Sequence, residues 1–318
     1  MRRPLHGFLL ALALAAPAAA EVHPNTAPGF PGEQSFHVGE IDNVNLFNGA
    51  LTLTIPLGPT YPVNGGLSYG LKLVYNANAW SYSTFIIVHD DGTEVTNPFS
   101  VPSVCSNAGL GWRVSLGEFD PPCQQPDGNG QISPHLYQDE NGTDHLFYPT
   151  LHQGDPEDAP QAGVTQVLYT RDGSYLRLKV LTDGRRNLEF PDGTVRTFDT
   201  EGRLAEIRDP FGNAVTVEYL KADGHPAPSR ETTAQWVLTD SHNRKQRVYF
   251  RFSLPDVPSL YWPLLDRVEL TAVGGGKANY QFSYETRTIG RACLSNDSML
   301  RTVKAILLTG VSLPDGSS

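Results

Sequence analysis

Histidine, serine, cysteine and paired carboxylates build most active sites, but this chain holds them without the spacing of a known catalytic motif. Its 318 residues contain no His-Glu-x-x-His zinc motif, no Gly-x-Ser-x-Gly nucleophile turn and no phosphate-binding Gly-rich loop. The nine histidines are scattered, and His135, His145 and His152 lie in segments with the composition of loops and strand edges. We therefore expect no metal site and no cofactor.

Acidic residues are the other potential source of chemistry. Residues 125–130 have the Asp, Asn and Gly composition of a calcium loop, but they lack further carboxylates at ligand spacing, which favours a simple turn. Two of the 34 acidic residues could face each other, as in a glycosidase. Turn sequences account for most of these aspartates, so we predict no catalytic residue and rank a polysaccharide-cleaving enzyme as the least favoured function.

The chain has three cysteines, Cys105, Cys123 and Cys293. In an oxidising compartment two of them are expected to pair, and we predict a disulfide between Cys105 and Cys123, which are 18 positions apart. For Cys293 the alternatives are an intermolecular bridge, a reactive thiol or, as we favour, a half-buried free cysteine. The closest histidine along the chain, His242, is 51 residues away, so the sequence supplies Cys293 with no local base.

The N-terminus predicts export. Arg2 and Arg3 precede an apolar run at residues 8–16, and three alanines at 18–20 form a small-residue cleavage site, so residues 1–20 have the layout of a secretory signal peptide. The apolar run is shorter than the roughly 20 residues that a spanning helix needs. Residues 21–35 are rich in proline and read as an extended leader. We expect a secreted or cell-surface protein, exported through the periplasm if the cell is Gram-negative.

Composition and alternation predict β-structure along the rest of the chain. Its 30 Gly, 25 Pro and 10% aromatic residues fit a turn-rich β protein. Residues 67–75 alternate apolar with mostly polar or small residues, the period of a half-buried strand. Residues 299–308 fit both a helical and a strand period, and their β-branched residues favour a strand. The net charge of −10 gives no general attraction to nucleic acid or an anionic membrane.

Residues 192–219 contain three short β-prone runs, separated by glycine-containing turns about ten residues apart. This spacing predicts an antiparallel meander in which Gly202 and Gly212 occupy turn positions, at least one of them with positive φ. Leu204 and Ile207 break strict alternation, which indicates a bulge or a strong twist in the middle strand.

The same segment resembles the RHS, or YD-repeat, family. Its spacing is aromatic-Asp-x-x-Gly-Arg-Leu-x-x-Ile-x-Asp-x-x-Gly-Asn, followed by Tyr. The matching positions are Phe198 (in place of the usual Tyr), Asp199, Gly202, Arg203, Leu204, Ile207, Asp209, Gly212, Asn213 and Tyr219. Residues 237–244 resemble the same turn with Asn243 at the Gly position, and Asn tolerates the left-handed conformation best among non-Gly residues. The resemblance implies a spiralling β-sheet that forms a shell around a C-terminal cargo, often a toxin, with the repeat residues in structural roles.

We therefore predict an all-β fold of antiparallel strand-turn repeats that form a curved or spiralling sheet, part of an RHS/YD shell. An N-terminal β region at 36–170 would precede a repeat region at 171–318 that continues in a longer product. The predicted function is that of a secreted, non-enzymatic structural protein that encloses or presents a C-terminal cargo. The alternative is a binding or adhesion module for cell-surface glycans or proteins. Its aromatic side chains, which more often belong to a core, would be Trp80, Tyr82, Trp236, Tyr261 and Trp262.

Overall fold

The computed structural model describes residues 36–38, 41–45, 49–89, 91–124, 135–290 and 302–317. The predicted signal peptide and leader, the turn at 125–130 and Cys293 lie outside these residues. Within them the expectation of an all-β fold is confirmed, because the strands form antiparallel sheets and the one helical element described is a 3₁₀ turn, Val273–Gly275. No helix in this part of the chain is long and apolar enough to cross a membrane.

The N-terminal half builds a five-stranded antiparallel sheet in the order β1-β2-β3-β4-β7. Its strands are β1 (Phe36–Val38), β2 (Asp42–Asn45), β3 (Leu51–Asn64), β4 (Leu67–Asn76) and β7 (Trp112–Val114). The strand predicted from alternation at 67–75 is confirmed as β4, which buries Tyr69, Leu71 and Leu73 on one face. This burial gives β4 one register and one orientation, because a shift by one residue would expose that apolar set.

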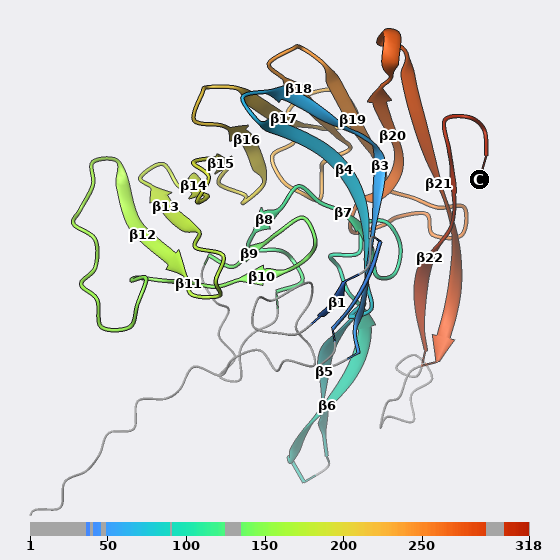
Figure 1. The fold of residues 1–318 in the computed structure, drawn as a ribbon. Helices are drawn as coiled ribbons and strands as arrows, with labels where there is room; N and C mark the ends of the chain where they lie inside the picture. The colour runs from blue at the N-terminus through green and yellow to red at the C-terminus, as the bar shows by residue number, and fades with distance from the viewer. Residues whose placement is uncertain are drawn as a thin grey trace, which may run out of the picture.

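Two smaller units follow β4. Strands β5 (Trp80–Val88) and β6 (Glu94–Pro102) pair with each other as a separate two-stranded ribbon, which projects away from the body of the molecule (Figure 1). Strands β8 (Glu118–Phe119), β9 (Tyr137–Gln138) and β10 (Asp144–His145) form a short three-stranded sheet in the order β10-β9-β8.

The second half is one twelve-stranded sheet in which every strand pairs with its neighbours in sequence, from β11 to β22. The strands are β11 (Phe147–Tyr148), β12 (Val164–Thr170), β13 (Arg177–Leu181), β14 (Arg186–Glu189), β15 (Val195–Phe198), β16 (Leu204–Arg208), β17 (Ala214–Leu220), β18 (Gln235–Asp240), β19 (Lys245–Arg251), β20 (Leu264–Thr271), β21 (Lys277–Gly290) and β22 (Thr302–Ser312). The ambiguous segment near residue 300 is a strand from Thr302 onward, as predicted. The sheet begins at β11, on the N-terminal side of residue 171.

The sheet is curved, and bulges contribute to its curvature. The register of β15 against β16 shifts between Thr197 and Phe198, so that Phe198 pairs with Leu204 while Thr197 pairs with Glu206. This places the predicted bulge at Ala205 in β16. Further register shifts occur between β12 and β13, β19 and β20, and β21 and β22. Each extra residue increases the local twist, and Figure 1 shows the sheet curling into an arc.

The N-terminal half packs inside this arc. Strands β7 to β10 lie within it (Figure 1), and the rings of Phe119 and Phe198 meet edge to face with centroids 4.8 Å apart. On β3 and β4, the hydroxyl of Tyr61 donates to the carbonyl of Thr271 at 2.7 Å, and Tyr69 is hydrogen-bonded to Asp240 at 3.0 Å. The inner face of the described sheet is therefore covered by the chain's own earlier strands, which form one core with it.

Candidate functional site

The turn between β15 and β16 spans residues 199–203, and hydrogen bonds to the Asp199 carboxylate stabilise it. Gly202 N–H donates to the Asp199 carbonyl at 3.0 Å, and Asp199 N–H donates to the Arg203 carbonyl at 2.9 Å. The Asp199 carboxylate accepts from the backbone N–H groups of Glu201 and Arg203, and from Arg203 Nε at 2.8 Å. Gly202 has φ +77°, as expected for a three-residue hairpin loop that ends in a left-handed residue.

The same turn recurs along the chain. Asp209 and Asp240 each accept two backbone N–H bonds and one side-chain bond from the residue four positions later. The left-handed position is held by Gly212 with φ +88° and by Asn243 with φ +60°. Asp139 in the N-terminal half accepts the same pair of backbone bonds. A local chemical rule, one aspartate and one left-handed residue per hairpin, thus repeats in the structure.

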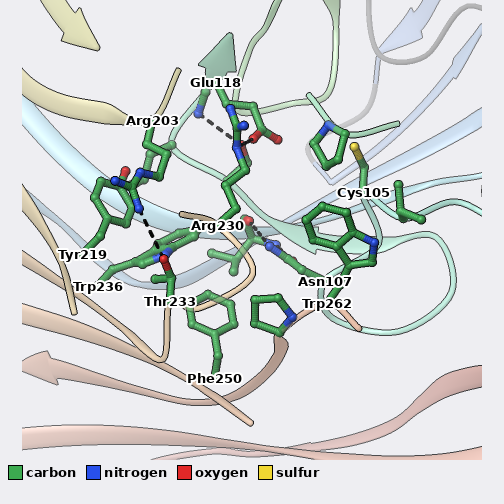
Figure 2. A pocket seen from close by; sticks show the side chains of 17 residues that line it. Cys105, Asn107, Glu118, Arg203, Tyr219, Arg230, Thr233, Trp236, Phe250 and Trp262 are labelled. Atoms are coloured by element: carbon green, nitrogen blue, oxygen red, sulfur yellow. Dashed lines mark hydrogen bonds and ion pairs between the residues drawn. The ribbon is translucent and has the colours of Figure 1, made fainter. Parts of the chain in front are cut away.

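A small cavity of about 90 Å³ lies beside the Asp199 turn (Figure 2). The aromatic part of its wall consists of Tyr219, Trp236, Phe250 and Trp262. The Arg203 guanidinium lies over the Tyr219 ring at 4.6 Å from its centroid. The ring centroids of Tyr219 and Trp236 are 6.0 Å apart, and those of Trp236 and Phe250 are 5.0 Å apart. Two predicted repeat residues, Arg203 and Tyr219, therefore form part of the cavity wall.

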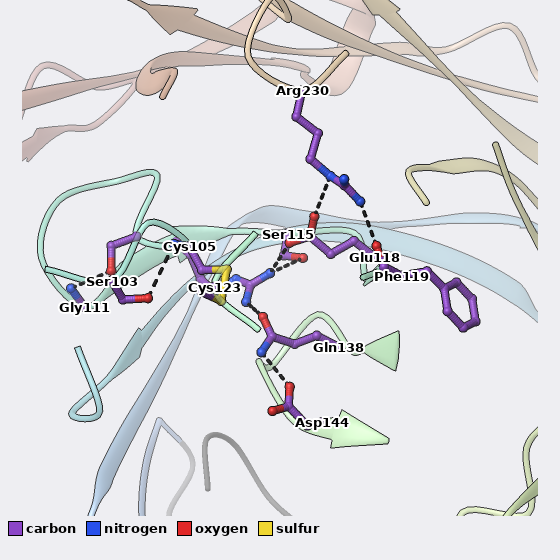
Figure 3. The surroundings of a disulfide bond; sticks show 12 residues. Ser103, Cys105, Gly111, Ser115, Glu118, Phe119, Cys123, Gln138, Asp144 and Arg230 are labelled. Carbon is purple, nitrogen blue, oxygen red and sulfur yellow. Dashed lines mark hydrogen bonds and ion pairs between the residues drawn. A yellow bond between two sulfur atoms is a disulfide. The ribbon is translucent and has the colours of Figure 1, made fainter. Parts of the chain in front are cut away.

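Charged groups at the cavity are engaged with each other. Glu118 accepts from Arg230 Nε at 3.1 Å and from Arg113 Nη2 at 3.2 Å (Figure 3). Arg230 also donates to the Phe119 carbonyl at 2.7 Å. Arg203 donates to the carbonyl of Ala227 at 3.0 Å. Since both Glu118 oxygens bind arginine, this carboxylate is poorly placed to act as a base and instead holds the cavity wall together.

A disulfide closes the other side of the cavity. Cys105, which contributes to the lining, is bonded to Cys123 with a Cα–Cα distance of 5.4 Å (Figure 3). The bond ties the loop before β7 to the loop after β8. Disulfides persist in oxidising compartments, so this bond weakly favours an extracellular location.

Removing this bond with the double variant Cys105→Ser/Cys123→Ser is expected to lower the free energy of unfolding by about 3 kcal/mol, because the cross-link restricts the unfolded chain. Urea unfolding of the variant and the wild type, each with and without reductant, measures the effect. Reductant should shift only the wild-type midpoint. Equal midpoints for wild type and double variant without reductant would show that the bond does not stabilise the fold.

A second cluster contains the residue types of a hydrolase triad in a different arrangement. His145 Nδ1 lies 2.6 Å from Asp172 Oδ2, and the Ser174 hydroxyl donates to the other oxygen of Asp172 at 2.5 Å. Ser174 and His145 therefore both bind the aspartate, and the hydroxyl does not point at the imidazole that would have to deprotonate it. His145 Nε2 lies 3.9 Å from Asp139. The geometry is that of a charge cluster that joins β10 to the β12–β13 turn.

This cluster predicts a pH-dependent stability. Burial alone would lower the pKa of His145, but the nearby carboxylates of Asp139 and Asp172, the second of which is hydrogen-bonded to the ring, outweigh it and raise the pKa from 6.5 to about 9. The protonated imidazole therefore contributes stability that is fully present below pH 6.5 and is lost as the pH rises through about 9. We expect the free energy of unfolding of the wild type to fall by about 1–3 kcal/mol as the pH rises through this range.

The control is the variant His145→Gln, which has no imidazole and should therefore lack this pH-dependent contribution to stability. Its free energy of unfolding, measured by urea titration at several pH values, should change less than that of wild type over the same window. Parallel pH profiles for the two proteins would contradict the assignment to His145.

The other predicted residues fall into two groups. Phe198 and Leu204 are fully buried in the core and Ile207 packs against it, whereas Asp209, Gly212 and Asn213 form the second turn, against the β3–β4 hairpin. Of the proposed aromatics, Trp236 and Trp262 line the cavity, while Tyr82 and Tyr261 are 66% and 78% exposed. No group of three or more metal-binding side chains occurs among the described residues.

Sequence reasoning missed Glu118, Arg230 and Phe250. Glu118 and Arg230 are 112 positions apart and share no motif, so only the packing of the N-terminal half inside the arc brings them together. The one available signal was that Glu118 lies close to Cys123 in the sequence, and an acidic residue near a cysteine does not specify a site.

The scan against protein-family models found no match for this chain, and the search of curated proteins likewise found none.

Proposed function

We propose that this chain is a secreted structural protein of the RHS/YD-repeat type, part of a β-shell that encloses or presents a C-terminal cargo, such as a toxin, in a longer product. The observation that supports this most strongly is the Asp-x-x-Gly turn, which recurs with the same hydrogen bonds at Asp199 and Asp209 and, with Asn243, at Asp240. These turns connect strands of one continuous sheet of twelve, as expected for a scaffold extended by repetition.

Two further features fit a scaffold. The repeat side chains near the cavity are used in contacts within the fold, such as the ion pair of Arg203 with Asp199. Strand β22 pairs with β21 on one side, and its Ile306 carbonyl accepts a bond from Leu110 N–H at 2.7 Å on another. The inner face of this stretch is covered by β3, β4 and β7 to β10, so the cargo would be held by parts of the shell that follow.

The reading frame that encodes the chain gives the first test. The proposal expects codons for further strand-turn repeats after Ser318, followed by a separate domain. A frame that ends at Ser318 in the natural gene would contradict a shell with a C-terminal cargo.

A second candidate function, glycan binding, is favoured by the exposed aromatic surface beside the cavity. Trp262 lines it, and the ring of Tyr261, 78% exposed, meets Trp262 edge to face with centroids 5.2 Å apart. Aromatic faces beside charged hydrogen-bonding groups are suited to sugars. A glycan array followed by calorimetry tests this, with Trp262→Ala expected to weaken binding by at least about tenfold. Tyr82→Ala, on the β5–β6 ribbon, is the matched control, and equal loss in both variants would contradict binding at the cavity.

A further inference from the structure

The β5–β6 ribbon has an apolar stripe and an acidic tip. Tyr82, Ile86 and Val88 lie on one face of β5 by alternation and are 66%, 58% and 63% exposed. Across residues 80–102 the sequence has three carboxylates, all between positions 90 and 94, and no Lys or Arg. A two-stranded ribbon in water is marginally stable without a covering surface, and exposed apolar patches of this kind mark interaction sites.

A basic groove lies at another end of the molecule. It has a volume of about 350 Å³ and is lined by Arg244, Lys245, Arg247 and Lys277, with Glu269 as its one lining carboxylate. Glu269 pairs with Lys277 at 2.8 Å and with Arg247 at 3.2 Å, and Arg244 pairs with Asp240 at 2.7 Å. The four cations still outnumber these two carboxylates, so the groove remains positive, and the side chain of Lys277 is 61% exposed whereas that of Glu269 is 14% exposed. The groove is therefore positively charged although the chain as a whole has a net charge of −10.

The groove also has an apolar neighbour. Its wall begins at the β18–β19 turn, which is joined to the start of β17, directly after the β16–β17 turn, by a hydrogen bond from Ser241 N–H to the Ala214 carbonyl at 3.0 Å. That neighbouring turn carries Phe211, whose side chain is 77% exposed. The groove end thus offers cations and an exposed aromatic ring, and the ribbon offers carboxylates and exposed aliphatic side chains.

We propose that the acidic tip of the β5–β6 ribbon docks into the basic groove of a second copy of this chain. In Figure 1 the ribbon points away from the β20–β21 turn that borders the groove, so one molecule does not close this contact on itself. The contact joins two different surfaces and is therefore heterologous, which generates rings or open filaments rather than a symmetric pair. An anionic membrane fits this ribbon poorly because both carry negative charge. The inference is independent of the proposed shell function.

The test is sedimentation velocity of the mature chain over a range of concentrations at low and high salt. We expect the weight-average mass to rise with concentration in about 50 mM salt, and the association constant to fall at least about tenfold in about 500 mM salt, because the contact is between exposed charges. A wild-type protein that remains monomeric up to about 100 μM at low salt overturns the proposal.

Two neutralising variants decide the geometry. The ribbon variant Asp91→Asn/Glu94→Gln and the groove variant Lys245→Gln/Lys277→Gln should each be largely monomeric. Mixed in equal amounts, they should form a dimer that grows no further, because one intact ribbon and one intact groove remain in each pair. A groove variant that assembles like wild type would show that ribbons pair with each other, and would overturn docking in the groove. Equal urea midpoints of the variants and wild type show that folding is intact.

Discussion

Replacing Gly202 with alanine is expected to lower the free energy of unfolding by about 4 kcal/mol, the sum of backbone strain and a steric clash. Gly202 has φ +77°, and a Cβ atom at this position would lie 2.4 Å from the Phe119 carbonyl oxygen. That oxygen accepts from Arg230, and Phe119 N–H donates to the Gly202 carbonyl at 2.8 Å. Relief of the clash therefore displaces the contact between the repeat turn and β8.

Gly212→Ala is the matched control, because it stands at the same position of the next turn. Its φ is +88°, but a Cβ atom there would have no neighbour within 4 Å. Only the strain of a left-handed alanine remains, which costs about 1 kcal/mol. Urea unfolding of both variants measures the difference. Equal losses would contradict the close packing of the N-terminal half against the Asp199 turn.

Phe198→Ala is expected to lower the free energy of unfolding by about 4 kcal/mol, which is typical of truncating a large core side chain. Phe198 is fully buried, and its ring lies edge to face against Phe119 at 4.8 Å and Tyr137 at 5.7 Å between centroids. The three rings join β15 to β8 and β9, so the cavity left by the truncation would lie at the junction of the two halves.

Phe211→Ala, the same chemical change on the same sheet, is the control for Phe198→Ala. Its side chain is 77% exposed, and we expect a change within about 0.5 kcal/mol. Thermal or urea unfolding followed by circular dichroism measures both. A loss of less than about 1 kcal/mol for Phe198→Ala would mean that the repeat aromatic does not anchor the N-terminal half.

The strand-turn repeat could be predicted from sequence because its determinants are local. Two residues specify the hairpin loop. One is an aspartate, whose carboxylate accepts a bond from the backbone N–H four positions later, and the other is a residue between them that tolerates positive φ. Asn243, with φ +60°, follows the same rule. The bulge at Ala205 was visible as the break in alternation between Leu204 and Ile207.

The candidate site could not be predicted because its parts are distant in sequence. The Glu118–Arg230 pair and the bond from Tyr69 to Asp240 exist because the N-terminal strands pack inside the arc. Periodicity indicates which face of a strand is buried, but it does not indicate which other strand covers that face. The apolar run at 84–89, ended by Asp-Asp-Gly at 90–92, predicts the β5–β6 hairpin, but it does not indicate that the hairpin stands apart from the other sheets, because a run of this kind also occurs in core strands.

The scaffold proposal is tested most directly by protease protection of the C-terminal segment in the longer product that we propose. The product would be digested across a urea series while intrinsic fluorescence reports the unfolding of the sheet. We expect the C-terminal segment to resist digestion until the sheet unfolds. Gly202→Ala should shift the onset of digestion and the unfolding of the sheet to lower urea concentrations together. A C-terminal segment that is cleaved while the sheet is still folded would contradict the account.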